Sequence, residues 1–476
     1  MNRKRTKIVA TISDKNCSPD FIRVLFEAGM DVIRINSAHL SLEGALKIIN
    51  NTREVSDRIA ILIDTKGPEI RTTICDDSIE LKKGNTVTIT GDPNKKTQNN
   101  CICVSYRSFA DDVPEGSLIL IDDGELELKA IRKNGNSLEC LVENDSILGS
   151  RKSVNIPGVT ICLPSLTKKD KTFIKMAIEQ DIDFIAHSFV RSKQDVQDVQ
   201  AILNEAGSEI KIIAKIENQE GVDNIDDILE NVYGIMVARG DLAIEIPYEK
   251  IPGIQRMIIN KCIKKRKPVI VATQMLHSMI SNPRPTRAEV SDIANAIYSQ
   301  TDAVMLSGET ASGKYPVEAV TTMTKVALEV EHNKEQYLEL ASENFAGEVS
   351  AYLAKVAVKT SIRIGARGII ADTVGGRTIR DMASYRGINL ILAQCYTTRA
   401  MRELALSYGV YASFQEKKKS IDEFIHIALK NLTIAHDLRN DDIVVVLAGN
   451  FSGGSGFSFI EVGSVNYLKD RVSIVE

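Results

Sequence analysis

The chain has 476 residues, of which 43% are hydrophobic and 26% charged, ordinary proportions for a globular protein with a large core. This length predicts about three domains. The net charge of −4 excludes a broad basic surface for nucleic acid, and no stretch approaches the ~20 apolar residues of a membrane span. The basic start of the chain lacks the apolar run of a signal peptide. The eight cysteines lack the spacing of a zinc site, so we expect reduced thiols in a cytoplasm.

Short apolar strands alternate with amphipathic helices at the start of the chain. Strands are predicted over Lys7–Ile12, Val32–Asn36 and Ile59–Thr65. Helices are predicted over Pro19–Ala28 and Leu42–Thr52. This βαβαβ order favours a parallel sheet with helices outside it.

From about Pro68 to Pro164 this order gives way to an alternating, turn-rich stretch. Typical turn sequences occur at 82–85, 91–94, 122–124 and 133–136. Strands such as Thr86–Thr90 and Ser117–Ile121 lie between the turns. The sequence therefore predicts an all-β domain inserted into the α/β one.

The first pattern resumes after Pro164, with a helix over Lys168–Glu179. Five more strands are predicted, over Phe184–Phe189, Lys211–Glu217, Gly234–Ala238, Pro268–Thr273 and Ala303–Leu306. Three strands before the insert and five after it make eight, which over ~240 residues is the size of a closed (β/α)8 TIM barrel. An open, doubly wound sheet is the alternative.

A further α/β block follows the barrel. Residues 331–344 are polar and predict a linking helix, and a new pattern begins at Glu348. Its strands are predicted over Gly368–Ala371, Asn389–Ala393, Gly409–Tyr411 and Ile443–Leu447, with Phe457–Val462 and Val472–Val475 as further candidates. We therefore predict a barrel domain (1–67 plus 164–333), a β-barrel lid (68–163) and a three-layer C-terminal domain (334–476).

One strand of the predicted barrel ends in two opposite charges. Because side chains alternate along a strand, Ile213, Lys215 and Glu217 share one face. Burying a cation and an anion at the end of a strand costs free energy unless both interact with a binding partner. A structural ion pair at the strand end is the other interpretation.

Polar residues end six of the eight predicted strands. They are Arg34, Asn36, Asp64, Thr65, Lys215, Glu217, Asp241, Thr273 and Ser307. Each alone could be a helix cap or a satisfied buried group, but in a barrel these ends meet at one rim, where chemistry gathers. Carboxylates suit Mg²⁺, and Lys215 and Arg34 suit phosphate or carboxylate. The rim predicts Mg²⁺-dependent chemistry on an anionic, phosphorylated substrate.

These stretches resemble the pyruvate kinase family over nearly the whole chain. The matching segments are Thr6–Ile12, Asp64–Arg71, Lys215–Asn218, Ile235–Leu242, Ala272–Leu276, Pro285–Glu289 and Ser307–Ala311. Their order and spacing agree with the family. The resemblance implies transfer of the phosphoryl group of phosphoenolpyruvate to ADP, giving pyruvate and ATP, the last step of glycolysis.

The resemblance also implies roles for the residues at the rim. Glu217 and Asp241 would bind Mg²⁺ (or Mn²⁺), and Asn36, Asp64 and Thr65 would bind K⁺. Substrate binding and catalysis would involve Arg34, Lys215, Gly240, Asp241, Thr273 and Ser307, the proton reaching the enolate through a water relay at Thr273 and Ser307. Asn36, His39, Arg71 and Lys152 would face the nucleotide. The inserted domain would close as a lid and exclude water.

The chain departs from the family pattern at several positions. Ser13-Asp14 replaces a usual Gly-Pro near the nucleotide edge, and Ala38 replaces a serine that lends its hydroxyl to K⁺. Glu69 is retained, and in this family it accompanies K⁺ dependence. We therefore predict that K⁺ is still required, with weaker affinity.

A second ligand site is predicted in the C-terminal block. Residues 373–378 open a helix after a strand, the geometry of an anion site, and resemble the family's sugar-phosphate effector segment. The candidate residues are Thr373, Gly376, Arg377 and Thr378. A glycine-rich loop at 451–456 would cover them. Val374 and Gly375 replace usual residues, so a sugar phosphate, AMP or no effector all remain open, as does a plain turn and helix start.

Two other functions compete with the kinase. A lyase or aldolase acting on pyruvate could use the same Glu/Asp pair but would not explain the insert, Lys152 or the C-terminal block. A catalytically impaired regulatory paralogue would fit Ala38 and Ser13-Asp14, but not the intact rim. The family resemblance also suggests a homotetramer, and no part of the sequence predicts nucleic acid or membrane partners.

Overall fold

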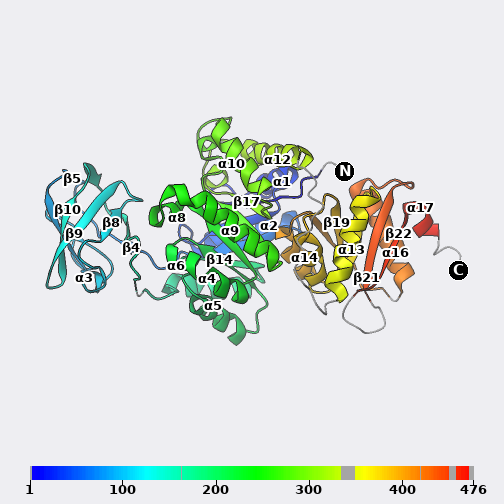
Figure 1. Ribbon diagram of the computed structural model, residues 1–476, viewed down its shortest axis with the longest axis horizontal. Coiled ribbons are helices and arrows are strands. Elements are labelled where there is room, and N and C mark those ends of the chain that lie inside the picture. Colours follow the sequence, from blue (N-terminus) through cyan, green and yellow to red (C-terminus); the bar gives the residue numbers. More distant parts are fainter. Residues whose placement is uncertain (1–2, 162, 334–348, 419, 450–456, 471–476) are drawn as a thin grey trace.

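A computed structural model describes residues 3–161, 163–333, 349–418, 420–449 and 457–470. Figure 1 shows three bodies in a row: the all-β insert at one end, a barrel in the middle and an α/β domain at the other end. Within those residues no helix has both the length and the apolarity that crossing a bilayer requires.

The central body is a closed barrel of eight parallel strands, in the order β1-β17-β16-β15-β14-β13-β3-β2. The strands are β1 (Lys7–Thr11), β2 (Val32–Asn36), β3 (Ala60–Asp64), β13 (Phe184–His187), β14 (Lys211–Ile216), β15 (Gly234–Ala238), β16 (Val269–Ala272) and β17 (Ala303–Leu306). All eight predicted strands are present, and closure excludes the open doubly wound sheet. The predicted (β/α)8 fold is confirmed.

Helices surround this barrel. They are α1 (Pro19–Ala28), α2 (Leu42–Val55), α4 (Lys168–Glu179), α5 (Lys193–Glu205), α6 (Gln219–Asp223), α7 (Ile225–Asn231), α8 (Arg239–Glu245), α9 (Ile251–Lys264), α10 (Arg287–Tyr298), α11 (Gly308–Ala311) and α12 (Pro316–Asn333). Capping residues next to the helix starts determine where several of these helices begin. In α10, for example, Thr286 Oγ1 accepts from Glu289 N while the Glu289 carboxylate accepts from Thr286 N, a capping box that satisfies donors at both positions.

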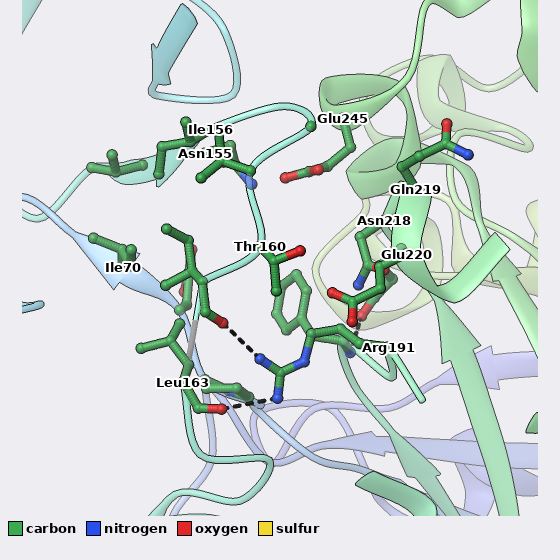
Figure 2. A pocket seen from close by; sticks show the side chains of 18 of the residues that line it. Ile70, Asn155, Ile156, Thr160, Leu163, Arg191, Asn218, Gln219, Glu220 and Glu245 are labelled. Atoms are coloured by element: carbon green, nitrogen blue, oxygen red, sulfur yellow. Dashed lines mark hydrogen bonds between the residues drawn. The ribbon is translucent and has the colours of Figure 1, made fainter. Parts of the chain in front are cut away.

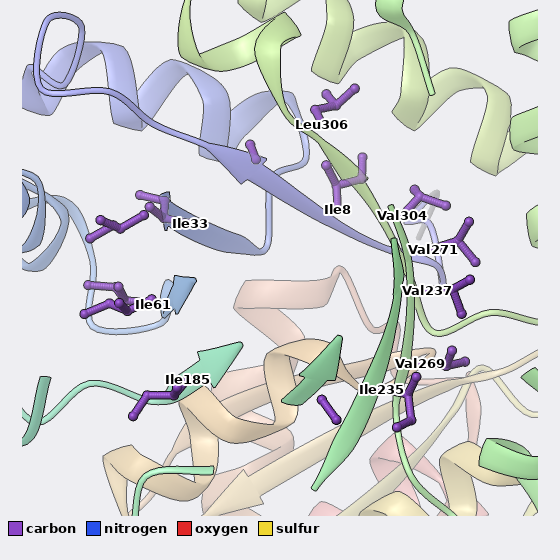
Figure 3. Packing of buried hydrophobic residues seen from close by; sticks show 14 of the residues in the cluster. Ile8, Ile33, Ile61, Ile185, Ile235, Val237, Val269, Val271, Val304 and Leu306 are labelled. Atoms are coloured by element: carbon purple, nitrogen blue, oxygen red, sulfur yellow. The ribbon is translucent and has the colours of Figure 1, made fainter. Parts of the chain in front are cut away.

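Strand alternation divides the apolar residues of the barrel between two cores. One set, including Ile8, Ile61, Ile235 and Val271, points outward and packs beneath the helices (Figure 3). The other set, including Ile213, fills the barrel interior. Lys215 follows Ile213 on the inward face, so the geometry of β14 carries this lysine to the mouth of the barrel.

The insert is built from short strands and one helical turn. They are β4 (Ile70–Arg71), β5 (Ile79–Leu81), β6 (Thr86–Thr90), β7 (Cys101–Cys103), α3 (Phe109–Asp112), β8 (Leu118–Ile121), β9 (Leu126–Asn134), β10 (Ser137–Val142), β11 (Ser146–Leu148) and β12 (Ser153–Asn155). Seven strands form one sheet, β4-β12-β8-β9-β10-β6-β7, and β11 pairs with β5. A bridge between Thr72 and Val104 joins the two edges of the larger sheet. Its own apolar core makes the insert a separate packing unit.

The C-terminal body has three layers. Its strands are β18 (Gly368–Thr373), β19 (Leu390–Cys395), β20 (Val410–Phe414), β21 (Ile443–Gly449) and the antiparallel β22 (Phe457–Ser464), in the order β20-β19-β18-β21-β22. Its helices are α13 (Val349–Arg363), α14 (Arg377–Ser384), α15 (Thr398–Glu403), α16 (Ile421–His436) and α17 (Val465–Asp470). Separate apolar clusters on the two faces of the sheet confirm the predicted layering.

Three predictions fall wholly or partly outside the described residues. They are the linking helix beyond Asn333, the strand over 472–475 and the glycine-rich loop at 451–456. The exact domain boundaries also stay predictions.

Candidate active site

The predicted functional side chains gather at the end of the barrel from which the insert projects. The chain leaves the barrel after β3 and returns before α4, so the insert lies over the C-terminal ends of the strands (Figure 1). In barrels of this kind, that end carries the chemistry.

Lys215 lies at the centre of this mouth. Its Nζ atom is 2.8 Å from Glu217 Oε1 and 3.1 Å from Asp64 Oδ1. It also donates a 2.8 Å hydrogen bond to Ser188 Oγ. Burial alone would lower the pKa of Lys215, but the carboxylates of Asp64 and Glu217 raise it above its ordinary value, so the side chain stays cationic.

A second cation, Arg34, lies beside the first. Arg34 Nε donates to Asp64 Oδ2 at 2.7 Å, and its NH1 group donates to Thr11 Oγ1 at 3.0 Å. Asp64 therefore bridges the two cations, one with each carboxylate oxygen. Burial would raise the pKa of Asp64, but Arg34 and Lys215 hold it below its usual range. Two fixed cations at one mouth favour a phosphate or carboxylate ligand.

The two oxygens of Glu217 differ in their hydrogen bonding. Its Oε2 atom accepts a 2.7 Å hydrogen bond from Phe189 N. Its Oε1 atom, although 2.8 Å from Lys215 Nζ, receives no well-aligned hydrogen bond within the described chain. Burial raises the pKa of Glu217, and the charge of Asp241 adds to that rise. A cation bound by both Glu217 and Asp241 would offset the free-energy cost of keeping these two neighbouring carboxylates ionised.

The backbone is strained where β16 ends. Thr273 has a φ of 70° and Gln274 a φ of 55°, a left-handed conformation that is costly for a β-branched residue. Gly240 N donates to Thr273 Oγ1 at 2.7 Å, and the NH2 group of Arg239 donates to Thr273 O at 2.7 Å. These bonds fix Thr273 against the first turn of α8.

A cavity of about 250 Å³ separates the base of the insert from the barrel mouth (Figure 2). On the barrel side, Arg191 donates to the backbone oxygens of Ile161 and Leu163, both at 2.9 Å, and so holds the returning chain. Across the cavity, the carboxylate of Glu245 faces Asn155 at the end of β12 (Figure 2). The insert is thus tied to the mouth by few polar contacts.

Comparisons with known proteins agree with this geometry. A family model described as "Pyruvate kinase, barrel domain" matches residues 3–320, and one described as "Pyruvate kinase, alpha/beta domain" matches residues 352–462. This chain belongs to the pyruvate kinase family.

Similar pyruvate kinases come from several organisms. One from Borreliella burgdorferi is 47% identical over 470 residues, with 98% of each chain covered. One from Geobacillus stearothermophilus is 43% identical, with 99% of this chain and 80% of that protein covered. A crystal structure of a pyruvate kinase from Cryptosporidium parvum superposes with a TM-score of 0.92 at 36% identity, covering 98% of this chain and 96% of that one.

The residues that pyruvate kinase resemblance assigns to K⁺ lie on neighbouring strands. Asn36 pairs with Asp64 in the register of β2 and β3, and Thr65 follows directly. Ala38, at the departing position, offers no side-chain oxygen, and its backbone N donates to Asn36 Oδ1 at 3.1 Å. The arrangement brings oxygen donors together, and their role toward K⁺ stays a prediction.

The residues predicted to face the nucleotide come from both sides of the mouth. His39 is exposed just after β2, whereas Arg71 and Lys152 lie on the insert, in and beside the paired strands β4 and β12. Lys152 Nζ is 2.6 Å from Asp122 Oδ2, and Arg71 Nε donates to Glu69 at 2.8 Å. A ligand would have to compete with these acids, and its binding here stays a prediction.

Sequence reasoning missed two residues of the mouth. Thr11 accepts from Arg34, and Ser188 accepts from Lys215 while donating to Thr65 O at 2.7 Å. Both stand at or just beyond the ends of strands one and four, the two strand ends left out of the predicted rim. A uniform search of all eight strand ends would have found them.

The predicted effector segment forms the start of α14. Gly376, with a φ of 76°, is the residue before the helix, and its backbone N donates to Thr373 Oγ1 at 2.8 Å. Arg377 and Thr378 follow in the first turn. Neighbouring Asp372 is buried and accepts from Tyr396 at 2.7 Å. Ligand binding at this segment stays a prediction.

Proposed function

We propose that this chain is a phosphotransferase that moves the phosphoryl group of phosphoenolpyruvate to ADP, forming pyruvate and ATP. One observation carries the proposal. Lys215 and Arg34 are fixed side by side at the mouth of the barrel, in a chain whose residues 3–320 and 352–462 match pyruvate kinase family models. Phosphoryl transfer needs positioning and neutralised charge more than covalent help, and these two cations supply both.

Different side chains at the mouth would bind the substrate and stabilise the charge that develops during transfer. Arg34 binds the phosphate of phosphoenolpyruvate, and Lys215 stabilises both the transferring phosphoryl group and the enolate that remains. Asp64 and Ser188 orient the Lys215 ammonium toward the mouth, because each is within 3.1 Å of Nζ. Gly240 and Thr273 border the carboxylate of the substrate.

The residues present fit a divalent cation. The Oε1 atom of Glu217, which receives no well-aligned hydrogen bond, and the nearby carboxylate of Asp241 give two hard oxygen ligands. No group of three or more His, Cys, Asp or Glu able to hold a metal occurs in the described ranges, so water and substrate oxygens would complete the shell, as is usual for Mg²⁺. Mg²⁺ or Mn²⁺ bound there would supply charge neutralisation between substrate and ADP.

A K⁺ ion at Asn36, Asp64 and Thr65 would add a further positive charge. The donor set fits such an ion, since the three residues adjoin in the paired ends of β2 and β3. With Ala38 in place of a serine, we predict that turnover requires K⁺ at raised concentration. Equal rates in sodium-only and potassium buffers would contradict this prediction.

The proton that converts the enolate to pyruvate would arrive through water held by Thr273 and Ser307, which end the adjacent strands β16 and β17. On the other side, His39, Arg71 and Lys152 would contact ADP when the insert closes as a lid. Closure would exclude water, which otherwise competes for the phosphoryl group.

One experiment tests the reaction. Pyruvate formation from phosphoenolpyruvate should depend on ADP and on Mg²⁺, and should rise with K⁺. Pyruvate formation without ADP would favour a lyase. Normal ligand binding with no turnover under any of these conditions would favour a regulatory paralogue.

Several finer properties belong to the same proposal. We expect a cytoplasmic homotetramer, with a sugar phosphate or AMP as effector at the start of α14. The helix start and the left-handed Gly376 support an anion there. Titration of each candidate effector against phosphoenolpyruvate saturation curves would identify it.

A further inference from the structure

A second polar cavity lies far from the mouth, where the start of the chain meets the C-terminal domain. It has a volume of about 440 Å³, within the range of small-molecule sites. Its walls come from the segment before β1, from the end of α12, and from the C-terminal domain at residues 365–367, 388–390 and 442–443. Any ligand here would touch both domains.

The lining carries more available positive than negative charge. Arg3, Arg5 and Arg367 face two carboxylates, Glu331 and Asp442. Glu331 is already engaged, since Oε1 accepts from Thr6 N at 2.6 Å and Oε2 accepts from Arg5 N at 2.7 Å. Its Oε2 atom also lies 3.4 Å from Arg5 Nε, so the charge of Glu331 is balanced by Arg5 within the wall.

The second carboxylate is also engaged. Asp442 Oδ2 accepts from Arg439 N at 2.8 Å and is 3.8 Å from Arg367 Nε, too far for a hydrogen bond. The cavity therefore presents a net positive surface.

Two donors in this lining lack an acceptor. Arg367 Nε and Asn389 Nδ2 make no hydrogen bond with any described residue, whereas Arg5 Nε lies 3.4 Å from Glu331 Oε2. Arg5 is also held in place, because its two other nitrogens donate to the backbone oxygens of Ile388 and Glu331. Leaving a buried donor unsatisfied is costly, and two such donors beside one cavity indicate a missing acceptor.

We propose that this cavity binds a small phosphate-bearing anion, either inorganic phosphate or the phosphate group of a small metabolite. The unpaired donors of Arg367 and Asn389 and the guanidinium groups of Arg3 and Arg5 come from different walls of the cavity. A carboxylate offers two oxygens, whereas a tetrahedral phosphate offers them in every direction. The anion would connect Arg5, at the entry to the barrel, with Arg367 and Asn389 of the C-terminal domain. It is separate from both the barrel mouth and the start of α14, whose residues do not line it.

The test is a calorimetric titration of the full-length protein with inorganic phosphate. The variants are Arg367→Gln and Asn389→Leu. The control is Arg363→Gln, which removes the same charge from an exposed position at the end of α13, outside the cavity. Unchanged turnover and melting temperature in each variant would establish that it is folded. Asn389→Leu keeps the test valid if loss of Arg367 disturbs folding.

We expect the wild type and the control to bind one more phosphate per chain than the two variants, or to bind it at least about tenfold more tightly. Phosphate should also raise the melting temperature of the wild type more than that of the variants, because it connects two domains. A parallel titration with glycerol 3-phosphate separates the two sources: tighter binding than phosphate assigns an organic phosphate, and weaker binding assigns the free ion. Equal stoichiometry and affinity in all four proteins would overturn the proposal.

Discussion

The barrel is joined to its two neighbours in opposite ways. At the bottom of the barrel, where strands begin, buried carboxylates tie it to the C-terminal domain. At the top, where strands end, the insert is connected by two chain crossings and by the hydrogen bonds of Arg191 beside a cavity. The catalytic groups lie at the loosely held end. The difference indicates a rigid base below the chemistry and a movable cover above it.

Asp302 illustrates the rigid junction. Its two oxygens receive the Arg386 guanidinium at 2.8 and 2.6 Å, and both side chains are 5% exposed. The same carboxylate accepts from Val269 N in the barrel and from Tyr408 N in the C-terminal domain. One residue thus joins two barrel strands to the neighbouring domain.

Two other aspartates at the bottom of the barrel make similar contacts. Asp183 accepts from Ile61 N at 2.8 Å in the barrel and from Arg402 Nε at 2.5 Å in the C-terminal domain. Asp31 accepts from Ile8 N at 2.9 Å. In all three cases an aspartate directly precedes a barrel strand and accepts a backbone hydrogen bond from the adjacent strand. The bottom of the barrel therefore serves stability, as expected for this fold.

Of the changes that test this contrast between the two junctions, Asp302→Asn should have the largest effect on stability. This change leaves Arg386 buried without its counter-charge, and breaking such a pair costs about 3–5 kcal/mol. Urea unfolding should show a lower midpoint. The control is Asp226→Asn, in an ion pair of 2.6 Å with Lys261 at the surface, which should cost at most about 1 kcal/mol. Equal midpoints for the two variants would remove the contrast between rigid and loose junctions.

The rigid junction should also respond to pH through Lys7. Lys7 donates to Val410 O at 2.5 Å, and burial lowers its pKa from the ordinary 10.5 to about 8. Between these pH values the unfolded chain holds a proton that the folded chain has lost, so stability rises with pH. From about pH 7 to pH 10, wild type should gain roughly 2 kcal/mol relative to Lys7→Met. Parallel pH profiles of unfolding free energy for the two proteins would refute this.

The smallest effect should come from the loose junction. Glu245→Ala removes the carboxylate that faces Asn155 across the cavity (Figure 2), and a polar contact of about 0.5–1.5 kcal/mol corresponds to a roughly 2–10-fold change in opening. Hydrogen exchange at residues 67–70 and 156–161 should accelerate by that factor. The control, Glu249→Ala, changes an exposed glutamate nearby and should leave exchange unchanged. A much larger effect would mean that the insert is held as firmly as the C-terminal domain.

The sequence predicted the top of the barrel better than the bottom. Strand periodicity located every barrel strand, and polar residues after apolar runs located Lys215 and Glu217. The roles of Asp183 and Asp302 were not predicted, because their partners Arg402 and Arg386 are more than eighty positions away along the chain. No local pattern pairs such residues. Their one sequence signal, an aspartate directly before an apolar strand, is recognisable only with the structure in hand.

Ser188 and the cavity around Arg5 and Arg367 also depend on contacts between residues far apart in the sequence, which local patterns do not predict. Ser188 stood at a predicted strand end, so its position was available from the sequence, but its bond to Lys215 depends on the neighbouring strand. The cavity depends on how two domains meet, and charge patterning along one chain carries no such information.

The most direct measurement compares Lys215→Met with Lys211→Met, the same substitution at the other end of β14, where Lys211 pairs with Glu403 at 3.6 Å. Lys215→Met should lower kcat for pyruvate formation by at least about 10²–10³-fold, because it removes a preorganised charge from the reacting centre. Binding of phosphoenolpyruvate should fall much less, and Lys211→Met should keep most of its turnover. Near-normal turnover by a folded Lys215→Met protein would contradict the account.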